Sequence, residues 1–320
     1  MFPRRSIVLA LPGIALLGAA GRALAETYPA RPVRFIVPVA PGSATDLTAR
    51  QVSAGLFKLW NSVPVVVENK PGAGTIIGTD AVAKAPADGY TLLFNLSSHY
   101  TSPVLNKTSY DPVKDFEPVA KLVSTALVMI TSVDSPFKTV QDVVAAAKKA
   151  PGTVTFASAG NGTTSHMGGA LLNNVAGIEL VHAPYKDGSQ AMVDTSTGQV
   201  KLGFSGPAAI PLIKSGKLRV LATTGATRSA HLPDVPTVKE ALHLDYEVTS
   251  PVWAFAPKGT PEAIVNQLSE AFGKIVATPE FKTFCDNQFL DLAYEPAATV
   301  RAAAAGEAAK WRKLVDLTRS

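Results

Sequence analysis

A loop of small polar residues in the middle of the chain, residues 158–165, has the composition of an anion site. Alternating β-branched residues before it predict a buried strand, and Thr163 or Thr164 is the expected N-cap of the helix after it. The first backbone N–H groups of a helix have no intrahelical partner and the helix dipole is positive there, so an anion suits this position. No Lys or Arg lies within residues 153–169, so amides, hydroxyls and His166 would have to bind the anion.

A second loop of the same form lies near the N-terminus. Residues 33–39 are a continuous apolar strand, residues 41–46 are a turn with capping residues, and residues 47–60 have helical spacing. Asp46 is an acid and would repel a carboxylate, so its expected role is to cap the helix or to brace the loop. Parallel α/β sheets bind ligands beyond the carboxyl ends of their strands, where this loop would lie.

Several other residues in predicted loops carry groups that can donate hydrogen bonds. His99 and His166 could each donate to an anion, but a packed, hydrogen-bonded histidine is an equally good interpretation of either. Tyr185 is a candidate for the rim of a cleft. The full set of candidate ligand-binding residues is Gly42, Ser43, Ala44, Asp46, Ser97, His99, Ala159, Gly160, Asn161, Thr163, His166, Tyr185 and Ser205.

Signatures of enzymes and metal sites are weak. The residues around Ser205, Gly-Phe-Ser-Gly, are one short of the G-x-S-x-G nucleophile elbow. The five histidines include no H-E-x-x-H motif and the chain has one cysteine, so no catalytic residue, metal site or cofactor is expected. That cysteine, Cys285, is expected to be a small, semi-buried apolar residue. An exported hydrolase that acts on a carboxylated substrate is the alternative function.

Strands alternate with helices along most of the chain, which predicts an α/β fold with mostly parallel sheets covered on both faces. Two long extended runs, near Leu122 and Tyr246, bracket the middle section. We expect them to be crossover strands that join two lobes. The expected organisation is a signal peptide at residues 1–25, a first lobe at residues 26–124 and 248–320, and a second lobe at residues 125–247.

The N-terminal segment has the pattern of a secretory signal. Arg4 and Arg5 precede an apolar run, and Ala23-Leu24-Ala25 provides the small residues of a cleavage site. Export would remove three arginines without removing an acid, which lowers the formal net charge from +5 to +2. The remaining basic residues are scattered, so the charge does not favour nucleic-acid binding.

Eight stretches, in order along the chain, carry a resemblance to a known family. They are PVAPGSATD (38–46), VVVENKPGAG (65–74), ADGYTLL (87–93), YDPVKDF (110–116), ASAGNGT (157–163), PYK (184–186), LPDVPT (232–237) and FAPKGTP (255–261). On these residues the chain resembles the extracytoplasmic solute-binding proteins of the Bug type, which serve tripartite tricarboxylate transporters. The stretches cover nearly the whole chain after the signal, so the resemblance extends to the fold.

The resemblance implies a two-lobed Venus-flytrap fold with a carboxylate ligand between the lobes. The loops at residues 41–46 and 158–163 would hold the ligand with backbone amides and ordered waters. Two helix N-termini would then face each other, each with about half a positive charge. The resemblance also implies a periplasmic protein that passes its ligand to inner-membrane transporter subunits, and we expect a monomer.

Departures from the family's pattern bear on the choice of ligand. Ser43 stands where many members have a second glycine, and Ala170 stands where an acid is common. Lys201 and Ser205 stand where the family often has aspartates. Without an acid at Ser205 a ligand ammonium would lack a partner, so we expect a plain carboxylic acid rather than an amino acid. Aliphatic di- or tricarboxylates and aromatic carboxylates both stay open.

Overall fold

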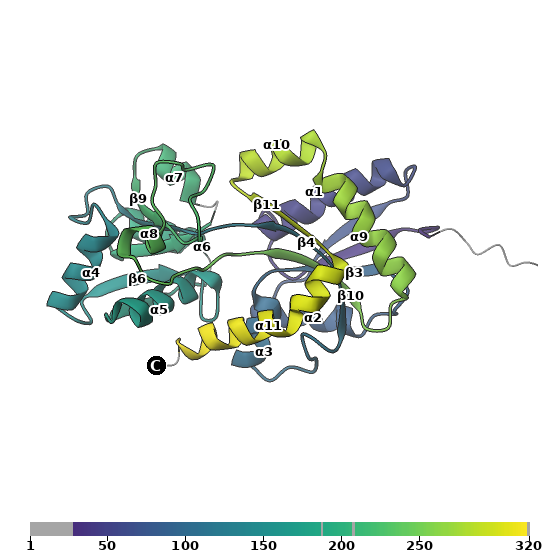
Figure 1. Ribbon diagram of the computed structural model, residues 1–320, viewed down its shortest axis with the longest axis horizontal. Helices are drawn as coiled ribbons and strands as arrows, with labels where there is room; N and C mark the ends of the chain where they lie inside the picture. The colour runs from purple at the N-terminus through teal and green to yellow at the C-terminus, as the bar shows by residue number, and fades with distance from the viewer. Residues whose placement is uncertain (1–27, 187, 207–208, 319–320) are drawn as a thin grey trace, which may run out of the picture.

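The computed structural model describes residues 28–186, 188–206 and 209–318. These residues form two lobes side by side along the long axis, each built on one β-sheet (Figure 1). The predicted signal peptide at residues 1–25 lies outside the described residues. None of the helices within the described ranges is long and apolar enough to span a membrane.

One lobe contains a six-stranded sheet in the order β11-β4-β10-β3-β1-β2. Its strands are β1 (Val33–Val37), β2 (Val65–Asn69), β3 (Thr91–Asn95), β4 (Phe116–Ser124), β10 (Val252–Pro257) and β11 (Asp291–Pro296). β1 pairs in parallel with β2 and β3, whereas β10 and β11 form antiparallel pairs with their neighbours.

The other lobe contains a five-stranded sheet in the order β7-β6-β8-β5-β9. Its strands are β5 (Val128–Ser132), β6 (Val154–Ser158), β7 (Leu180–Pro184), β8 (Leu202–Ser205) and β9 (Leu218–Thr223). β6 pairs in parallel with β7 and β8, and β5 is antiparallel to β8 and β9.

Both sheets are therefore mixed, which corrects the expectation of mostly parallel sheets. β1, β3, β6 and β8 end at the edge where the two lobes face each other. β5 and β10 begin at that edge because the chain enters each of them from the other lobe, so they run against these neighbours. A hydrophobic run indicates where a strand lies but not its direction.

Helices cover both faces of each sheet, as the alternation predicts. In the six-stranded lobe they are α1 (Ala44–Leu59), α2 (Ile76–Ala83), α3 (Ser98–Leu105), α9 (Glu262–Val276), α10 (Pro279–Gln288) and α11 (Ala297–Asp316), with a short 3-10 turn, η1 (Ala73–Thr75). In the five-stranded lobe they are α4 (Val140–Lys149), α5 (Thr164–Ala176), α6 (Gly188–Ser196), α7 (Ile210–Lys214) and α8 (Val238–Leu242). α1, α9 and α10 pack on one face of the larger sheet, and α2, α3 and α11 pack on the other.

Two extended segments join the lobes, so the predicted crossover strands are confirmed. The first runs from β4 almost directly into β5, and the second leads into β10. Thr125 and Ser250 exchange two backbone hydrogen bonds of 3.1 and 2.8 Å, and Ala126 pairs with Thr249. The two segments thus form one antiparallel ribbon between the lobes.

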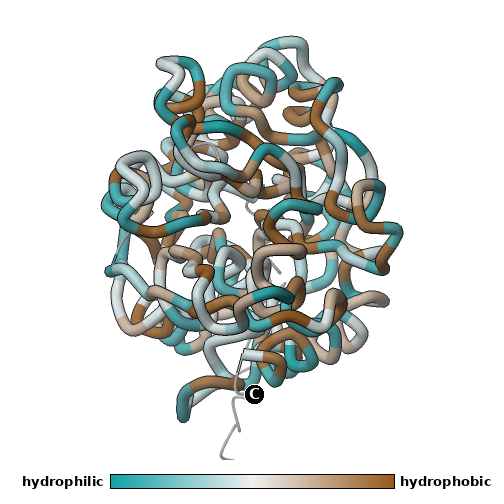
Figure 2. Tube along the Cα trace, turned by 90° about the vertical axis from the view of Figure 1, so that its left-hand side faces the viewer, coloured by the Kyte–Doolittle hydropathy of each residue, from teal (hydrophilic) through white to brown (hydrophobic). Residues whose placement is uncertain are grey.

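The hydrophobic core is continuous across the two lobes. One buried cluster contains Trp253 of β10, Phe156 of β6 and Trp311 of α11. α11 packs on α3 and β4 in one lobe and on α5 in the other (Figure 1). In Figure 2, which looks along the long axis, hydrophobic segments cross the middle of the trace and hydrophilic segments are frequent at its outer loops.

Candidate ligand-binding cleft

The two predicted anion loops both follow strands that end where the two lobes face each other. The Ser97 hydroxyl, just after β3, lies 2.7 Å from the Thr164 hydroxyl at the start of α5. The Thr101 hydroxyl of α3 donates to the Gly162 carbonyl at 3.1 Å. Because β1 is the neighbour of β3, α1 begins one strand away from this contact, and α1 and α5 both start at the lobe-facing edges of their sheets.

The first loop is shaped to present the N-terminus of α1. Gly42 adopts a left-handed φ of +82°, a conformation that favours glycine, and turns the chain into the helix. The Ser43 hydroxyl caps α1 by accepting from Asp46 N at 3.2 Å. The N–H groups of Ala44 and Thr45 have no partner within the helix, because they belong to its first turn. Ser43 and Ala44 are half-buried.

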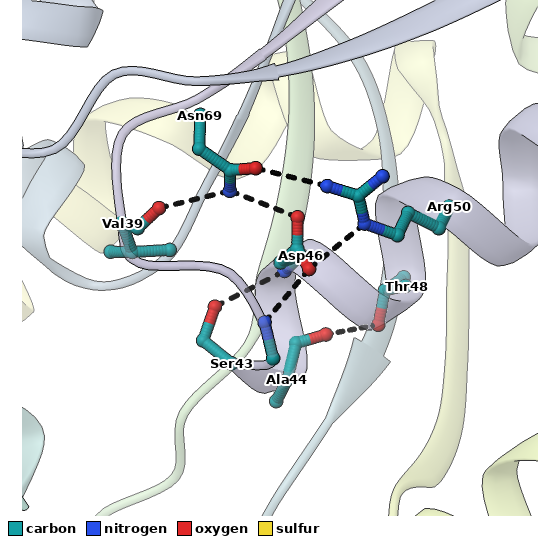
Figure 3. A network of polar contacts seen from close by, with 8 residues as sticks. Val39, Ser43, Ala44, Asp46, Thr48, Arg50 and Asn69 are labelled. Carbon is teal, nitrogen blue, oxygen red and sulfur yellow. Dashed lines mark hydrogen bonds and ion pairs between the residues drawn. The ribbon is translucent and has the colours of Figure 1, made fainter.

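Asp46 braces this loop from behind (Figure 3). Its side chain is 2% exposed, and its oxygens accept from Gly42 N at 2.9 Å, Arg50 Nε at 3.0 Å and Asn69 Nδ2 at 2.9 Å. Asn69 also donates to the Val39 carbonyl at 3.0 Å. Burial raises the pKa of Asp46, but the hydrogen bonds from Arg50, Gly42 and Asn69 outweigh it and hold the pKa below its usual value. The geometry favours the brace interpretation and corrects the inclusion of Asp46 among the ligand contacts.

The second loop presents the N-terminus of α5 in the same way. Thr163 is the N-cap: its hydroxyl accepts from His166 N at 3.3 Å and donates to the Gly160 carbonyl at 2.7 Å. The N–H groups of Thr164 and Ser165 belong to the first turn and have no partner within the helix. Both loops therefore offer free amides beside a capping hydroxyl.

The tip of the second loop combines exposed and constrained residues. Ala159 and Asn161 are exposed, but the Ala159 N–H is already engaged because it donates to Ser165 Oγ at 3.0 Å. Gly160 has a φ of +117°, and a Cβ there would lie 3.3 Å from the Tyr185 carbonyl. This close approach of two backbone segments explains the glycine at that position.

His166 supports the second loop instead of facing the gap. Its ring stacks on His182 with 3.6 Å between centroids, and its Nδ1 accepts from Gly162 N at 3.2 Å. His182 Nε2 lies 2.6 Å from Ser158 Oγ. Burial lowers the pKa of both rings to about 4, and for His166 the neighbouring His182 contributes to the same shift. His166 is thus a neutral acceptor for the loop, which is the packed, hydrogen-bonded interpretation and corrects its inclusion among the ligand contacts.

His99 lies in the core, which corrects its place in the predicted site. The ring is fully buried and stacks on Phe255 at 4.1 Å, with Tyr100 and Phe116 against its edges. Its Nε2 lies 2.8 Å from the Pro112 carbonyl. Burial lowers the pKa of His99 to about 4, although the bond to Pro112 opposes this. Of the two interpretations of His99, the structure supports the packed, hydrogen-bonded histidine.

Ser97 and Tyr185 use their hydroxyl groups within the protein. Ser97 is 1% exposed and contacts Thr164, so it links the lobes. The Tyr185 hydroxyl donates to Asp194 Oδ2 at 2.7 Å, and burial raises its pKa to about 12. Tyr185 is half-buried, and its hydroxyl is held by α6.

Ser205 lies at the end of β8 and lines a cavity of about 180 Å³ between the lobes. The crossover residues Thr125 and Ala126 form another wall, and Phe289, at the end of α10, closes it from the other lobe. Among the described residues of the lining there is no Asp or Glu, which agrees with the argument that Ser205 leaves no partner for an ammonium group.

Several residues that shape the site were not singled out from the sequence. Arg50 and Asn69 complete the brace of the first loop, and Ser165 holds the second. Asn69 ends β2, the strand next to β1, so the rule that parallel neighbours end together could have placed it at the first loop. No comparable rule could have placed Phe289 at the cavity from its position in the sequence.

Comparison with known proteins agrees with this geometry. The sequence profile of the tripartite tricarboxylate transporter family receptor matches residues 48–318. The chain belongs to this receptor family. Protein BugT of Bordetella pertussis is 37% identical over 288 residues, which cover 84% of this chain and 88% of that protein. A protein from the gbd 5' region of Cupriavidus necator is 36% identical over 279 residues, covering 87% and 85%.

Solved structures resemble the receptor over nearly its whole length. The periplasmic binding protein BugD is 32% identical with a TM-score of 0.79, covering 91% of this chain and 98% of that one. An R. palustris protein with adipate has a TM-score of 0.82 at 28% identity, covering 91% and 98%. MatC from Rhodopseudomonas palustris with bound malate has a TM-score of 0.77 at 28% identity, covering 90% and 100%. The predicted Bug-type resemblance and two-lobed fold are confirmed, and the family is one of solute-binding receptors.

Proposed function

We propose that this receptor binds a small carboxylate between its lobes and passes it to a membrane transporter without converting it. The observation that carries the proposal is the pair of helix N-termini, those of α1 and α5, at one interlobe gap. Free helix N–H groups and the positive ends of two dipoles favour a carboxylate over a cation or a neutral solute. The related structures that hold adipate and malate support the same class of ligand.

In this proposal the receptor captures its ligand when the two lobes close about the crossover ribbon. The moving bodies are residues 26–124 with 248–320 and residues 125–247, and the hinge lies at the paired Thr125 and Ser250. A carboxylate that contacts both loops binds the closed arrangement more tightly than the open one, so it shifts the population towards closure. In this proposal the hydrogen bond between Ser97 and Thr164 belongs to the closed arrangement.

Binding without turnover is supported by the surroundings of Ser205. Ser205 and His231 line the same cavity, yet His231 Nε2 is 3.3 Å from the Leu290 carbonyl and 3.9 Å from Asp291. A serine nucleophile needs its base within about 2.6–3.2 Å, and no hydrogen bond joins these two side chains in the described part of the chain. Burial raises the pKa of the Cys285 thiol to about 12, which keeps it protonated. The purified receptor should release no product from carboxylate esters or amides.

We place the receptor in the periplasm as a monomer that docks on inner-membrane transporter subunits. The family's members include periplasmic binding proteins, and the sequence pattern of residues 1–25 indicates export with cleavage near Ala25. N-terminal sequencing of protein recovered from a periplasmic fraction should begin at Glu26. Recovery with residues 1–25 still attached would contradict this placement.

The substitution Thr163→Ala tests the site against a matched control. Thr139 is the N-cap of α4, at the far end of the same lobe (Figure 1), and its hydroxyl accepts from Asp142 N at 3.2 Å. Loss of either cap should cost about 1 kcal/mol of stability. We expect only Thr163→Ala to weaken carboxylate binding, by about tenfold in calorimetric titration. If Thr139→Ala weakened carboxylate binding equally, or if Thr163→Ala left it unchanged, the proposed position of the site would be wrong.

A further inference from the structure

Two histidines from different elements stack on each other next to the second loop. His166 is in the first turn of α5 and His182 is in β7, and their rings are 3.6 Å apart between centroids and 10° from parallel. Phe156 of β6 extends the stack, with its ring 4.9 Å from that of His182. Two rings this close repel each other strongly if both carry a proton, so the stack requires at least one neutral ring.

Each ring holds a different part of the second loop. His166 Nδ1 accepts from the Gly162 N–H at 3.2 Å. His182 Nε2 lies 2.6 Å from Ser158 Oγ, and that oxygen also accepts from the Gly160 N–H at 3.1 Å. The two histidines therefore support the loop where it leaves β6 and where it enters α5.

Gly162 connects this support to the other lobe. Its carbonyl accepts from the Thr101 hydroxyl of α3 at 3.1 Å. A Cβ at this position would overlap the side chain of Leu105, which also belongs to α3. Gly162 is thus held by His166 in its own lobe and by Thr101 in the other. A change at His166 therefore acts through one residue on a contact between the lobes.

The two rings respond differently to a proton. Because His166 Nδ1 accepts a hydrogen bond, the neutral ring carries its hydrogen on Nε2. A second proton would go to Nδ1 and place an N–H group against the Gly162 N–H, so this hydrogen bond would be lost. His182 Nε2 can donate to Ser158 Oγ in the charged ring as well as in the neutral ring. His166 is therefore the ring at which protonation changes the loop.

Protons reach both rings from one groove. His166 and His182 line a groove of about 440 Å³, and the ring of His166 is nearly buried. The elements packed against the rings present uncharged side chains to the groove: Phe156 of β6, Asn173 and Asn174 of α5, and Leu317 and Thr318 after α11. The charged residue in the described lining is Glu179, which is exposed and precedes β7; Asp316 of α11 lies outside the lining. Burial and the ring of His182 together keep the pKa of His166 low, at about 4.

We propose that His166 and His182 are positioning residues that make ligand binding depend on pH: the cleft holds a carboxylate while His166 is neutral and releases it when Nδ1 takes up a proton. The inference rests on the proposed function and adds the regulation of that same site. Proton uptake frees the Gly162 N–H, and the loop leaves the position in which Thr101 reaches the Gly162 carbonyl. The amides at the start of α5 then no longer act together with those of α1.

The direct test is the pKa of His166 with and without a ligand, measured by NMR on its ring resonances. The probe is adipate, which a related structure holds. If a proton on His166 weakens binding about tenfold, saturation with adipate must lower the pKa of His166 by about one unit, because the coupling is reciprocal. A carboxylate that acted only through its charge would raise this pKa. A pKa that rises or stays the same would overturn the proposal, whereas that of His99, which does not touch the loop, should stay unchanged.

Two substitutions at one position separate the acceptor from the ring. His166→Asn places an amide oxygen close to the position of Nδ1 and cannot take up a proton, whereas His166→Phe keeps a ring without an acceptor. In calorimetric titration with adipate at pH 7, we expect His166→Asn to bind within about threefold of the parent chain and His166→Phe to bind about tenfold more weakly. The Gly162 amide resonance should shift with pH near 4 in the parent chain and not in His166→Asn. Equal affinities of the two variants would overturn the role of Nδ1.

The outcomes separate this inference from the proposed function. Adipate binding that Thr163→Ala weakens, together with a His166 pKa that does not fall on saturation, overturns the pH control and leaves the proposed function in place. A fall in this pKa together with weaker binding by His166→Phe supports both. If neither adipate nor malate binds the parent chain at pH 7, both proposals fail.

Discussion

The hydroxyl of Thr163 and the carboxylate of Asp46 have the same effect at two different loops. Each fixes the first turn of a helix, so that free N–H groups border the interlobe gap. His166 acts on the second loop in a similar way, through the Gly162 N–H. At this scale the site consists of backbone donors, and the side chains position them.

Asp46→Asn should destabilise the protein by about 2–4 kcal/mol. The substitution removes a buried charge that accepts from Gly42, Arg50 and Asn69, and places an amide hydrogen against one of these donors. Asp286→Asn is the control, because its ion pair with Lys282 at 3.3 Å is exposed and should contribute less than about 1 kcal/mol. Urea unfolding measures the free energy of unfolding of both variants. Equal destabilisation by the two substitutions would contradict the role of Asp46 as a brace of the first loop.

Two buried histidines, His99 and His166, and the half-buried His182 should make stability depend on pH. The pKa values of His99, His166 and His182 are about 4 in the folded chain, against about 6.5 when unfolded. Between these values the unfolded chain binds protons that the folded chain does not. The histidine contribution to the free energy of unfolding is therefore fully present above pH 6.5 and decreases as the pH falls from 6.5 towards 4. Below pH 4 this contribution no longer changes with pH.

His99 should provide a large share of this dependence, because it is fully buried. Its shift corresponds to about 3 kcal/mol over the window. Urea unfolding between pH 7 and 4 should show a shallower slope for His99→Phe than for the parent chain. His243→Asn, at an exposed position, is the control and should keep the slope of the parent. A slope that His99→Phe leaves unchanged would contradict the assignment.

At the scale of elements, the order of strand, loop and helix at both anion loops could be predicted from the sequence. The apolar runs before residues 41–46 and 158–165 and the capping residues after them placed both loops at helix N-termini, and the structure has them there. His99 was misplaced because residues 98–105 form α3 after a short turn, and the ring points into the aromatic core. Sequence spacing does not report which way a side chain in such a turn will face.

One buried hydroxyl adds to the backbone hydrogen bonds that hold the ribbon between the lobes. Thr224 is fully buried, accepts from Leu127 N at 2.8 Å and donates to the Val248 carbonyl at 2.5 Å, so it ties the two crossover segments together. Thr224→Val should cost about 2–3 kcal/mol, because it leaves buried backbone groups unpaired. Its neighbour Thr223 has no partner for its hydroxyl among the described residues, and Thr223→Val should cost nothing. Similar losses for the two variants in urea unfolding would contradict this difference.

At the scale of the whole molecule, the crossovers determine both the sheet order and the site. The extended runs near residues 122 and 246 indicated two lobes, and the relatives and related structures agree with that fold. The direction of β5 and β10 could not be predicted, because it depends on which lobe the chain leaves before each strand begins. The cavity at the ribbon could not be predicted either, since its walls come from six separate parts of the chain that only the tertiary fold brings together.

The central claim is that one carboxylate contacts the N-termini of α1 and α5 together. The most direct test is an NMR titration of the isotope-labelled chain with terephthalate or adipate, following the backbone amides of Ala44, Thr45, Thr164 and Ser165. We predict that all four resonances shift and saturate at the same ligand concentration, because both loops bind one molecule. Shifts confined to one loop, or to residues outside both, would contradict a ligand held between the lobes.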